Sequence, residues 1–120
     1  EMARRCREHI RMLSVDSAPR EACGLIVADG GMYPEAISSA NVAVGKDEYA
    51  VDPRTQLVWA GKTVGVWHSH VEKTSTPSDV DLRLAVPGLW YLIYSVRYDE
   101  TSLWQLDRGK VSYGTLQWRA

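Results

Sequence analysis

One stretch decides how this chain folds and where its polar side chains gather: VGVWHSHVEKTSTPSDVD, residues 64–81. Residues 64–67 are apolar and β-prone, and the strand that they predict continues through Ser69 to His70. Side chains two positions apart in a strand point to the same face, so the imidazoles of His68 and His70 are expected to lie side by side.

A short helix is expected to follow. Pro77 is typical of a helix start, with Thr76 or Ser78 as the N-cap, and Asp81 then shares a helix face with Ser78, three residues away. Two imidazoles from a strand and one carboxylate from a facing helix make a three-ligand set. Catalytic zinc keeps three protein ligands and one open position, whereas structural zinc takes four ligands, usually including cysteines.

A second stretch supplies a candidate proton acceptor. Zinc with an open position lowers the pKa of its water toward about 7, and that water still has to lose a proton to a base. The upstream sequence APREACGLIV, residues 18–27, places Glu21 immediately before a strongly apolar strand. A carboxylate at such a strand entry can reach a cleft and act first as general base and then as general acid.

Together these residues resemble the JAMM (MPN-plus, Mov34/PAD-1) zinc metalloprotease family. The matching pattern is Pro-x-Glu-x-Cys-Gly, then His-x-His, seven residues, and Ser-x-x-Asp, and it covers most of the chain. The resemblance implies that zinc is bound by His68, His70 and Asp81. It also implies that Glu21 transfers protons and that Ser78 stabilises the tetrahedral oxyanion.

The chain departs from the family pattern at one position. Many members have proline after the second histidine, where this chain has Val71. The change affects the loop after the strand and leaves the ligand set intact.

The sequence predicts one domain over residues 1–120, with an α/β fold in which helices cover both faces of a mixed sheet. The family resemblance implies a fold similar to that of cytidine deaminases. Helices are expected at residues 2–15, 54–60 and 78–85. Strands are expected at residues 22–28, 32–40, 49–51, 64–70, 89–96, 102–107 and 111–118, with Pro34 marking an edge strand and residues 89–96 a central one.

Composition narrows the class of protein. The 120 residues are 45% hydrophobic and 24% charged, an ordinary balance for a globular domain. A net charge of −1 gives no broad electrostatic footprint for nucleic acid. No apolar run is long enough to cross a membrane and no signal peptide is visible, so no membrane partner is expected. The only two cysteines, Cys6 and Cys23, favour a reduced, cytoplasmic setting.

Three further residues stand out: His9 and Cys23 have two interpretations each, and Gly24 has one. His9, beside the apolar stripe of the first helix, is either a fourth metal residue or a structural or surface histidine, and the complete ligand set favours the second. Cys23 is either a thiol beside the site or a small buried hydrophobe. Gly24 is expected to allow a close backbone approach near the metal.

The connecting segments suggest a substrate. Residues 41–52 and 83–88 are short, whereas JAMM deubiquitinases carry insertions there that grip two folded bodies. The chain therefore resembles the compact bacterial subgroup, such as the Mec-type proteins of cysteine biosynthesis. These enzymes hydrolyse an amide bond after the Gly-Gly end of a small ubiquitin-like sulfur carrier. The tail is expected to add as a strand along residues 49–51 or 36–40.

Other functions remain open. A phage tail-assembly JAMM domain shares the Pro-Arg-Glu-x-Cys-Gly-Leu-Ile entry, and MPN-minus subunits are non-catalytic scaffolds that have lost part of the motif. A zinc deaminase would need a Pro-Cys-x-x-Cys sequence, which is absent. An amidohydrolase barrel that begins with His-x-His would need a far longer chain.

Overall fold

The computed structural model describes residues 4–30, 34–45, 47–107 and 110–119, with side chains up to residue 106. The described helices are α1 (Arg4–Ser17), α2 (Pro53–Val58) and α3 (Asp79–Leu84). The described strands are β1 (Cys23–Val27), β2 (Glu35–Ser39), β3 (Thr63–His70), β4 (Trp90–Ser95), β5 (Glu100–Asp107) and β6 (Lys110–Arg119). None of these helices is long and apolar enough to cross a membrane.

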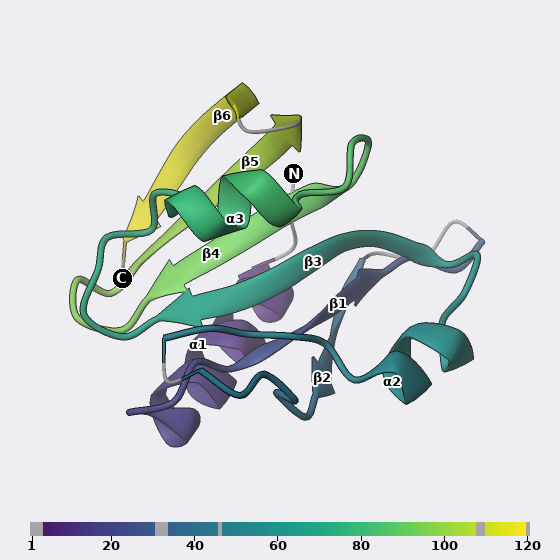
Figure 1. Cartoon of the computed structure of the whole chain (residues 1–120), viewed down its shortest axis with the longest axis horizontal. Coiled ribbons are helices and arrows are strands. Elements are labelled where there is room, and N and C mark those ends of the chain that lie inside the picture. The colour runs from purple at the N-terminus through teal and green to yellow at the C-terminus, as the bar shows by residue number, and fades with distance from the viewer. Residues whose placement is uncertain (1–3, 31–33, 46, 108–109, 120) are drawn as a thin grey trace.

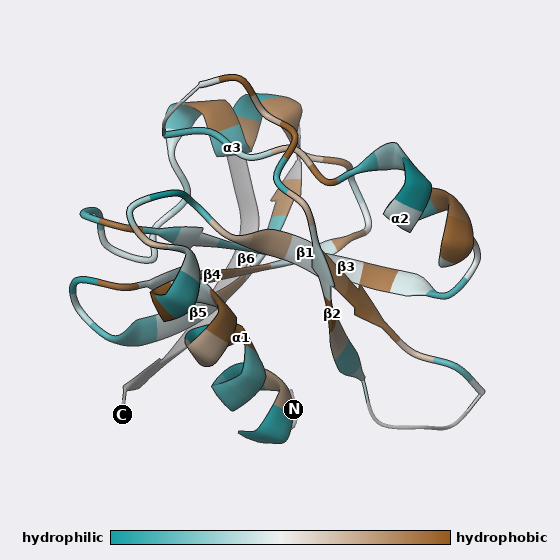
Figure 2. Ribbon diagram, turned by 90° about the horizontal axis from the view of Figure 1, so that it is seen from below, coloured by the Kyte–Doolittle hydropathy of each residue, from teal (hydrophilic) through white to brown (hydrophobic). Residues whose placement is uncertain are grey.

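The described strands form one sheet in the order β2-β1-β3-β4-β5-β6 (Figure 1). Only β3 and β4 pair in parallel, and every other neighbouring pair is antiparallel. Helix α1 lies on one face of the sheet, while α2 and α3 lie on the other (Figure 2). The predicted α/β fold with a mixed, helix-covered sheet is thus confirmed, with β2 at an edge and β4 inside the sheet.

Two apolar layers cover the two sheet faces, as strand alternation requires. Beneath α1, Cys6 and Ile10 of the helix pack against Ile26, Trp67 and Leu92 of the sheet. On the opposite face a smaller cluster contains Cys23, Leu25, Val27 and Val51. Because His68 and His70 alternate with Trp67 along β3, their rings lie on this second face, toward α3. Both cysteines are buried and free.

Several element boundaries differ from the predictions. Helix α1 extends to Ser17, and β5 and β6 form a longer hairpin than expected. The predicted helix start at Asp52-Pro53 is confirmed, because the Asp52 side chain accepts a hydrogen bond from the amide of Arg54. Residues 2–3 and 32–33 of the predicted elements lie outside the described residues.

The predicted strand at residues 49–51 is wrong. In the described part of this segment only an isolated bridge joins Asn41 to Val51. The Asn41 side chain accounts for the difference, since its Oδ1 accepts hydrogen bonds from the amides of Ala43 and Ala50. An amide that donates to a side chain cannot donate to a neighbouring strand.

The expected close approach at Gly24 occurs, but on the face away from the histidines. The Trp67 indole crosses β1 at this glycine and its Nε1 donates to the Ile37 carbonyl of β2 at 3.1 Å. A Cβ on Gly24 would lie 1.9 Å from that carbonyl oxygen and 2.5 Å from Trp67 Nε1. Gly24 therefore lets a buried indole link three neighbouring strands, and the predicted approach to the metal is corrected.

We expect Gly24→Ala to lower the free energy of unfolding by about 3 kcal/mol or more, the upper end of overpacking costs. The clash is with backbone, which cannot move without breaking the β1–β2 pairing. Denaturant unfolding measures the change. Gly45→Ala is the matched control, because its nearest neighbours all belong to the flexible Glu48 side chain, and we expect a change within about 0.5 kcal/mol. Equal stability of the two variants would contradict the packing role of Gly24.

Candidate metal centre

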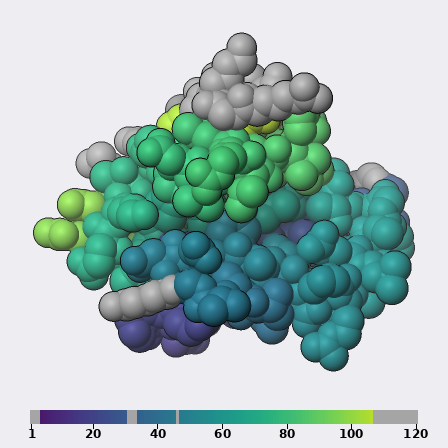
Figure 3. Space-filling model, in the orientation of Figure 1, coloured from purple at the N-terminus to yellow at the C-terminus, as the bar shows by residue number. Residues whose placement is uncertain are grey.

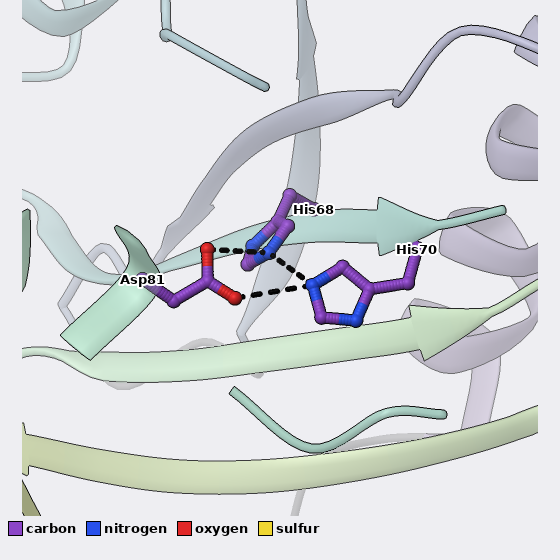
Figure 4. Close-up of side chains that lie close together, drawn as sticks. All are labelled: His68, His70 and Asp81. Atoms are coloured by element: carbon purple, nitrogen blue, oxygen red, sulfur yellow. Dashed lines mark hydrogen bonds and ion pairs between the residues drawn. The ribbon is translucent and has the colours of Figure 1, made fainter. Parts of the chain in front are cut away.

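Three side chains from two elements converge at the end of β3 (Figure 4). His68 and His70 come from the strand, and Asp81 comes from the first turn of α3. Nε2 of His68 lies 3.3 Å from Nε2 of His70 and 3.2 Å from Oδ1 of Asp81. Nε2 of His70 lies 3.1 Å from Oδ2 of Asp81. All three residues are buried, and together they form a group that can hold a metal ion.

The spacing of these donor atoms fits a small tetrahedral cation. Four-coordinate zinc with bonds of about 2.0–2.1 Å separates its ligand atoms by about 3.3 Å. The two Nε2 atoms, 3.3 Å apart, match this value, and each lies close to a different oxygen of Asp81, His68 at 3.2 Å from Oδ1 and His70 at 3.1 Å from Oδ2. Two imidazoles and one carboxylate are also a donor set that suits zinc. The residues present therefore fit the predicted ion.

His70 is oriented by the loop that follows it. Its Nδ1 lies 2.7 Å from the carbonyl oxygen of Thr74. A carbonyl only accepts hydrogen bonds, so Nδ1 carries a proton, and Nε2 faces the other two side chains and can offer its lone pair to a cation bound between them. The loop is held from the sheet, where Ser95 Oγ donates to the Lys73 carbonyl and Trp104 Nε1 donates to the Ser75 carbonyl.

Asp81 is oriented by the N-cap of its own helix. Ser78 Oγ accepts from the Asp81 amide at 3.1 Å, and the Ser78 amide donates to Asp81 Oδ2 at 2.9 Å, which forms a capping box. Ser78, rather than Thr76, is thus the N-cap. A hydroxyl that accepts one hydrogen bond can still donate its own proton, so Ser78 remains able to act as a donor.

Burial and pairing shift the pKa values of the group. Burial disfavours the charge on Asp81, but hydrogen bonds with His68 and His70 outweigh it and hold the pKa of the carboxyl well below its usual range. Burial lowers the pKa of His68. Burial also opposes protonation of His70, yet its hydrogen bonds to Asp81 and Thr74 leave the pKa raised. The stable form thus contains an ionised aspartate, which is the form that binds cations.

Glu21 lies beside this group, just before β1, and is 7% exposed. Burial raises the pKa of its carboxyl to about 7, and repulsion from Asp81 adds to the rise while His70 opposes it. The peptide unit that follows Glu21 is held at both polar atoms, because Asn41 Nδ2 donates to the Glu21 carbonyl and the Ala22 amide donates to Ser69 Oγ. A pKa near the ambient pH suits a group that accepts and returns a proton.

A pocket of about 580 Å³ opens beside these residues and is lined by Glu21, Ser78 and Asp81. The lining also includes residues 47–51 and, from the chain between Val80 and Leu89, Val80, Leu84, Val86 and Leu89. Both segments reach the surface on the same face of the molecule (Figure 3). The floor is apolar, with Leu25 and Val66. The pocket can therefore take an extended chain segment next to the candidate metal group.

The structure brings the five predicted site residues into one region, and it leaves out His9, the further histidine considered from the sequence. His9 is exposed on α1, on the opposite face of the sheet, so it does not join the ligand group. Cys23 is a buried thiol whose pKa is raised by burial to about 12, which fits the small-hydrophobe interpretation.

Sequence reasoning missed Asn41 and Tyr49. The Tyr49 ring stacks on the His68 ring with centroids 4.0 Å apart and an interplanar angle of 15°. Asn41 ties the loop that carries Tyr49 to the backbone of Glu21. Asn41 lies in a predicted loop and Tyr49 in a predicted strand, and no periodic pattern in the sequence indicates either contact.

Comparison with known proteins agrees with this geometry. The model of the family described as prokaryotic homologs of the JAB domain matches residues 3–107. A search of curated proteins gives no significant match. Among solved structures, a protein from Desulfitobacterium hafniense is 25% identical, with a TM-score of 0.75 over 94% of this chain and 87% of that one.

Two further solved structures share the fold. A JAB1/MPN domain protein from Archaeoglobus fulgidus is 19% identical, with a TM-score of 0.61 over 90% of each chain. A protein from Salinibacter ruber is 22% identical, with a TM-score of 0.67 over 98% of this chain and 90% of that one. Since the family model spans nearly the whole chain, the protein belongs to the JAB/MPN family, as one of the prokaryotic homologs of the JAB domain.

Proposed function

We propose that this protein is a zinc-dependent peptidase or isopeptidase that cleaves an amide bond after the Gly-Gly end of a ubiquitin-like or sulfur-carrier protein. One observation carries the proposal: a buried His-His-Asp group whose donor atoms lie close enough together to hold a metal ion shares its surroundings with a carboxyl whose pKa is about 7. The JAB family includes metallopeptidases, which agrees with this combination.

The side chains of His68, His70 and Asp81 would hold the ion. Zinc held there would supply Lewis-acid chemistry, which makes a carbonyl easier to attack and a water molecule easier to deprotonate. Side chains of the protein would stabilise the oxyanion and transfer the protons. The Ser78 hydroxyl is free to donate a hydrogen bond to the carbonyl oxygen as negative charge develops there, and such preorganised donors stabilise the transition state.

Glu21 carries the proton. Its ionised carboxylate takes a proton from the attacking water and then gives it to the nitrogen of the leaving amine. The raised pKa supports both halves of this cycle, because neither form of the side chain is strongly favoured near neutral pH. The hydrogen bond from Asn41 Nδ2 to the Glu21 carbonyl at 2.9 Å limits the backbone motion of this residue.

A peptide tail that ends in Gly-Gly is the substrate that we propose for this pocket. Glycines have no side chains, so such a segment can lie extended against the pocket lining with its backbone close to the metal group. Residues 41–52 connect β2 to α2 without additional secondary structure in the described part, which leaves little protein to grip a second folded body. A small group on the far side of the bond needs no such grip.

The ligand assignment is tested by metal content. We expect one zinc per chain in the wild-type protein, and at least a tenfold loss of zinc affinity in His68→Ala, His70→Ala and Asp81→Asn, since each removes one of three donors. Competition with a chromophoric chelator measures the affinity. His9→Ala is the matched control and should bind zinc normally. Wild-type affinity in any of the three ligand variants would contradict the assignment.

Glu21→Gln separates proton transfer from folding. We expect zinc binding to persist and turnover to fall by about 10²–10⁴, because an amide cannot accept the water's proton. Turnover of the zinc-loaded variant on a carrier-tail substrate, followed by mass spectrometry, measures the loss. Near-normal turnover would remove Glu21 from the mechanism.

The same substitution should stabilise the metal-free protein in a pH-dependent way. Folding raises the pKa of Glu21 from about 4.5 to about 7, so the ionised form favours the unfolded state. The penalty is absent below pH 4.5, grows up to pH 7 and is then constant. We therefore expect Glu21→Gln to add at most about 3 kcal/mol above pH 7 and little near pH 4.5. Denaturant unfolding across this range is the measurement, and a gain that grew toward acidic pH would contradict it.

Substrate choice is tested with a panel of adduct-bearing sulfur carriers, ubiquitin dimers and free tail peptides, each with and without a zinc chelator. We expect cleavage of carriers with a short extension after Gly-Gly, loss of cleavage when the glycines become bulky, and slower turnover of free peptides, since remote contacts help to orient the bond. Efficient, chelator-sensitive cleavage of ubiquitin dimers with intact carriers would instead indicate a deubiquitinase-like activity.

A further inference from the structure

The two histidines of the metal group are held in different ways. His70 has a hydrogen bond from Nδ1 to the Thr74 carbonyl at 2.7 Å. His68 is completely buried, yet its Nδ1 has no hydrogen-bond partner among the described residues. Metal-binding histidines almost always use their second nitrogen to fix the ring orientation. His68 therefore needs another restraint if its Nε2 is to stay aimed at Asp81.

Tyr49 is placed to supply that restraint. Its ring lies face to face with the His68 ring, with centroids 4.0 Å apart and planes inclined by 15°. A flat aromatic surface at this distance hinders rotation of the imidazole about its Cβ–Cγ bond. Tyr49 also lines the pocket, so it stands between solvent and the ring.

Asn41 holds Tyr49 from both sides in the sequence. Its Nδ2 donates to the Glu48 carbonyl at 2.9 Å, and its Oδ1 accepts from the Ala50 amide at 3.1 Å. The same side chain also accepts from the Ala43 amide and donates to the Glu21 carbonyl. An asparagine amide has two donor hydrogens and an oxygen with two lone pairs, and all are used here. The backbone on either side of Tyr49 is thereby fixed without a strand.

We propose that Tyr49 is the positioning residue of His68, with ring stacking in place of the missing hydrogen bond, and that Asn41 sets the position of Tyr49. The inference rests on the proposed metal site, but it concerns ligand orientation and not the choice of substrate. The aromatic face is the active feature, and the phenol hydroxyl has no part in it.

The test compares three substitutions at Tyr49. Tyr49→Phe keeps the aromatic face, Tyr49→Leu fills a similar space without one, and Tyr49→Ala removes both. Tyr98→Ala is the control, an aromatic removal at an exposed position between β4 and β5. We expect zinc affinity, measured by chelator competition, to fall about 10–100-fold in the Leu and Ala variants, as for loss of other outer-shell partners. The Phe variant and the control should match the wild type.

A second measurement uses the metal-free protein and reads the stack directly. Ring-current shifts move the His68 ring protons upfield in NMR spectra, and we expect the shift to persist in Tyr49→Phe and to vanish in Tyr49→Leu. Asn41→Asp, which loses both donated hydrogen bonds, should reduce it. An unchanged shift in Asn41→Asp would remove Asn41 from the proposal.

The outcomes separate the two proposals. Equal zinc affinity in folded wild-type, Leu and Ala proteins would overturn the positioning role, and so would a loss in Tyr49→Phe as large as that in Tyr49→Ala. A wild-type protein that binds zinc with this pattern of variants, but leaves every carrier tail intact, would overturn the proposed function and support the inference about Tyr49.

Discussion

The hydrogen bond between His70 Nδ1 and the Thr74 carbonyl is the contact on which the site depends. It joins the end of β3 to the loop that brings Asp81 back over the sheet. The parallel pairing of β3 with β4 helps to hold this loop, because it sets Ser95 opposite His70 where both strands end. Ser95 Oγ then donates to the Lys73 carbonyl at 2.6 Å, one residue before Thr74. Sheet topology thus determines the position of a helix-borne ligand.

Keeping this group together requires the burial of two carboxyl groups, which is electrostatically unfavourable. Asp81 and Glu21 are both less than 10% exposed, and buried carboxylates are unfavourable unless they are paired. The capping box and two imidazoles satisfy Asp81, which keeps its pKa low. Glu21 has no comparable partner among the residues that the structure describes, and burial and the nearby Asp81 charge raise its pKa to about 7. A divalent cation would offset this excess of negative charge, which makes the vicinity of the base a suitable place for a metal.

Local patterns predicted the elements well, since their causes lie within a few residues. The N-caps at Asp52 and Ser78 follow from adjacent side chains and backbone amides. Alternation along β3 placed both histidines on one face. Interactions between distant residues were not predictable in this way. The close approach at Gly24 was predicted near the metal, but Gly24 accommodates Trp67 on the other face of the sheet. The strand predicted at residues 49–51 is replaced by hydrogen bonds to the Asn41 side chain.

The loop between residues 41 and 51 is fixed at its base, and its outer part can vary. The Asn41–Val51 bridge, the bond from the Val42 amide to the Ala50 carbonyl and the Asn41 side chain close the loop at its base. Tyr49 lies next to this closed base, whereas Asp47 is exposed farther out along the pocket. Lengthening a loop beyond a fixed base costs little entropy, about 0.6 kcal/mol for each doubling of its length. The outer loop can therefore change length or charge, and with it the substrate that is admitted, while the stack on His68 and the backbone of the proton acceptor stay in place.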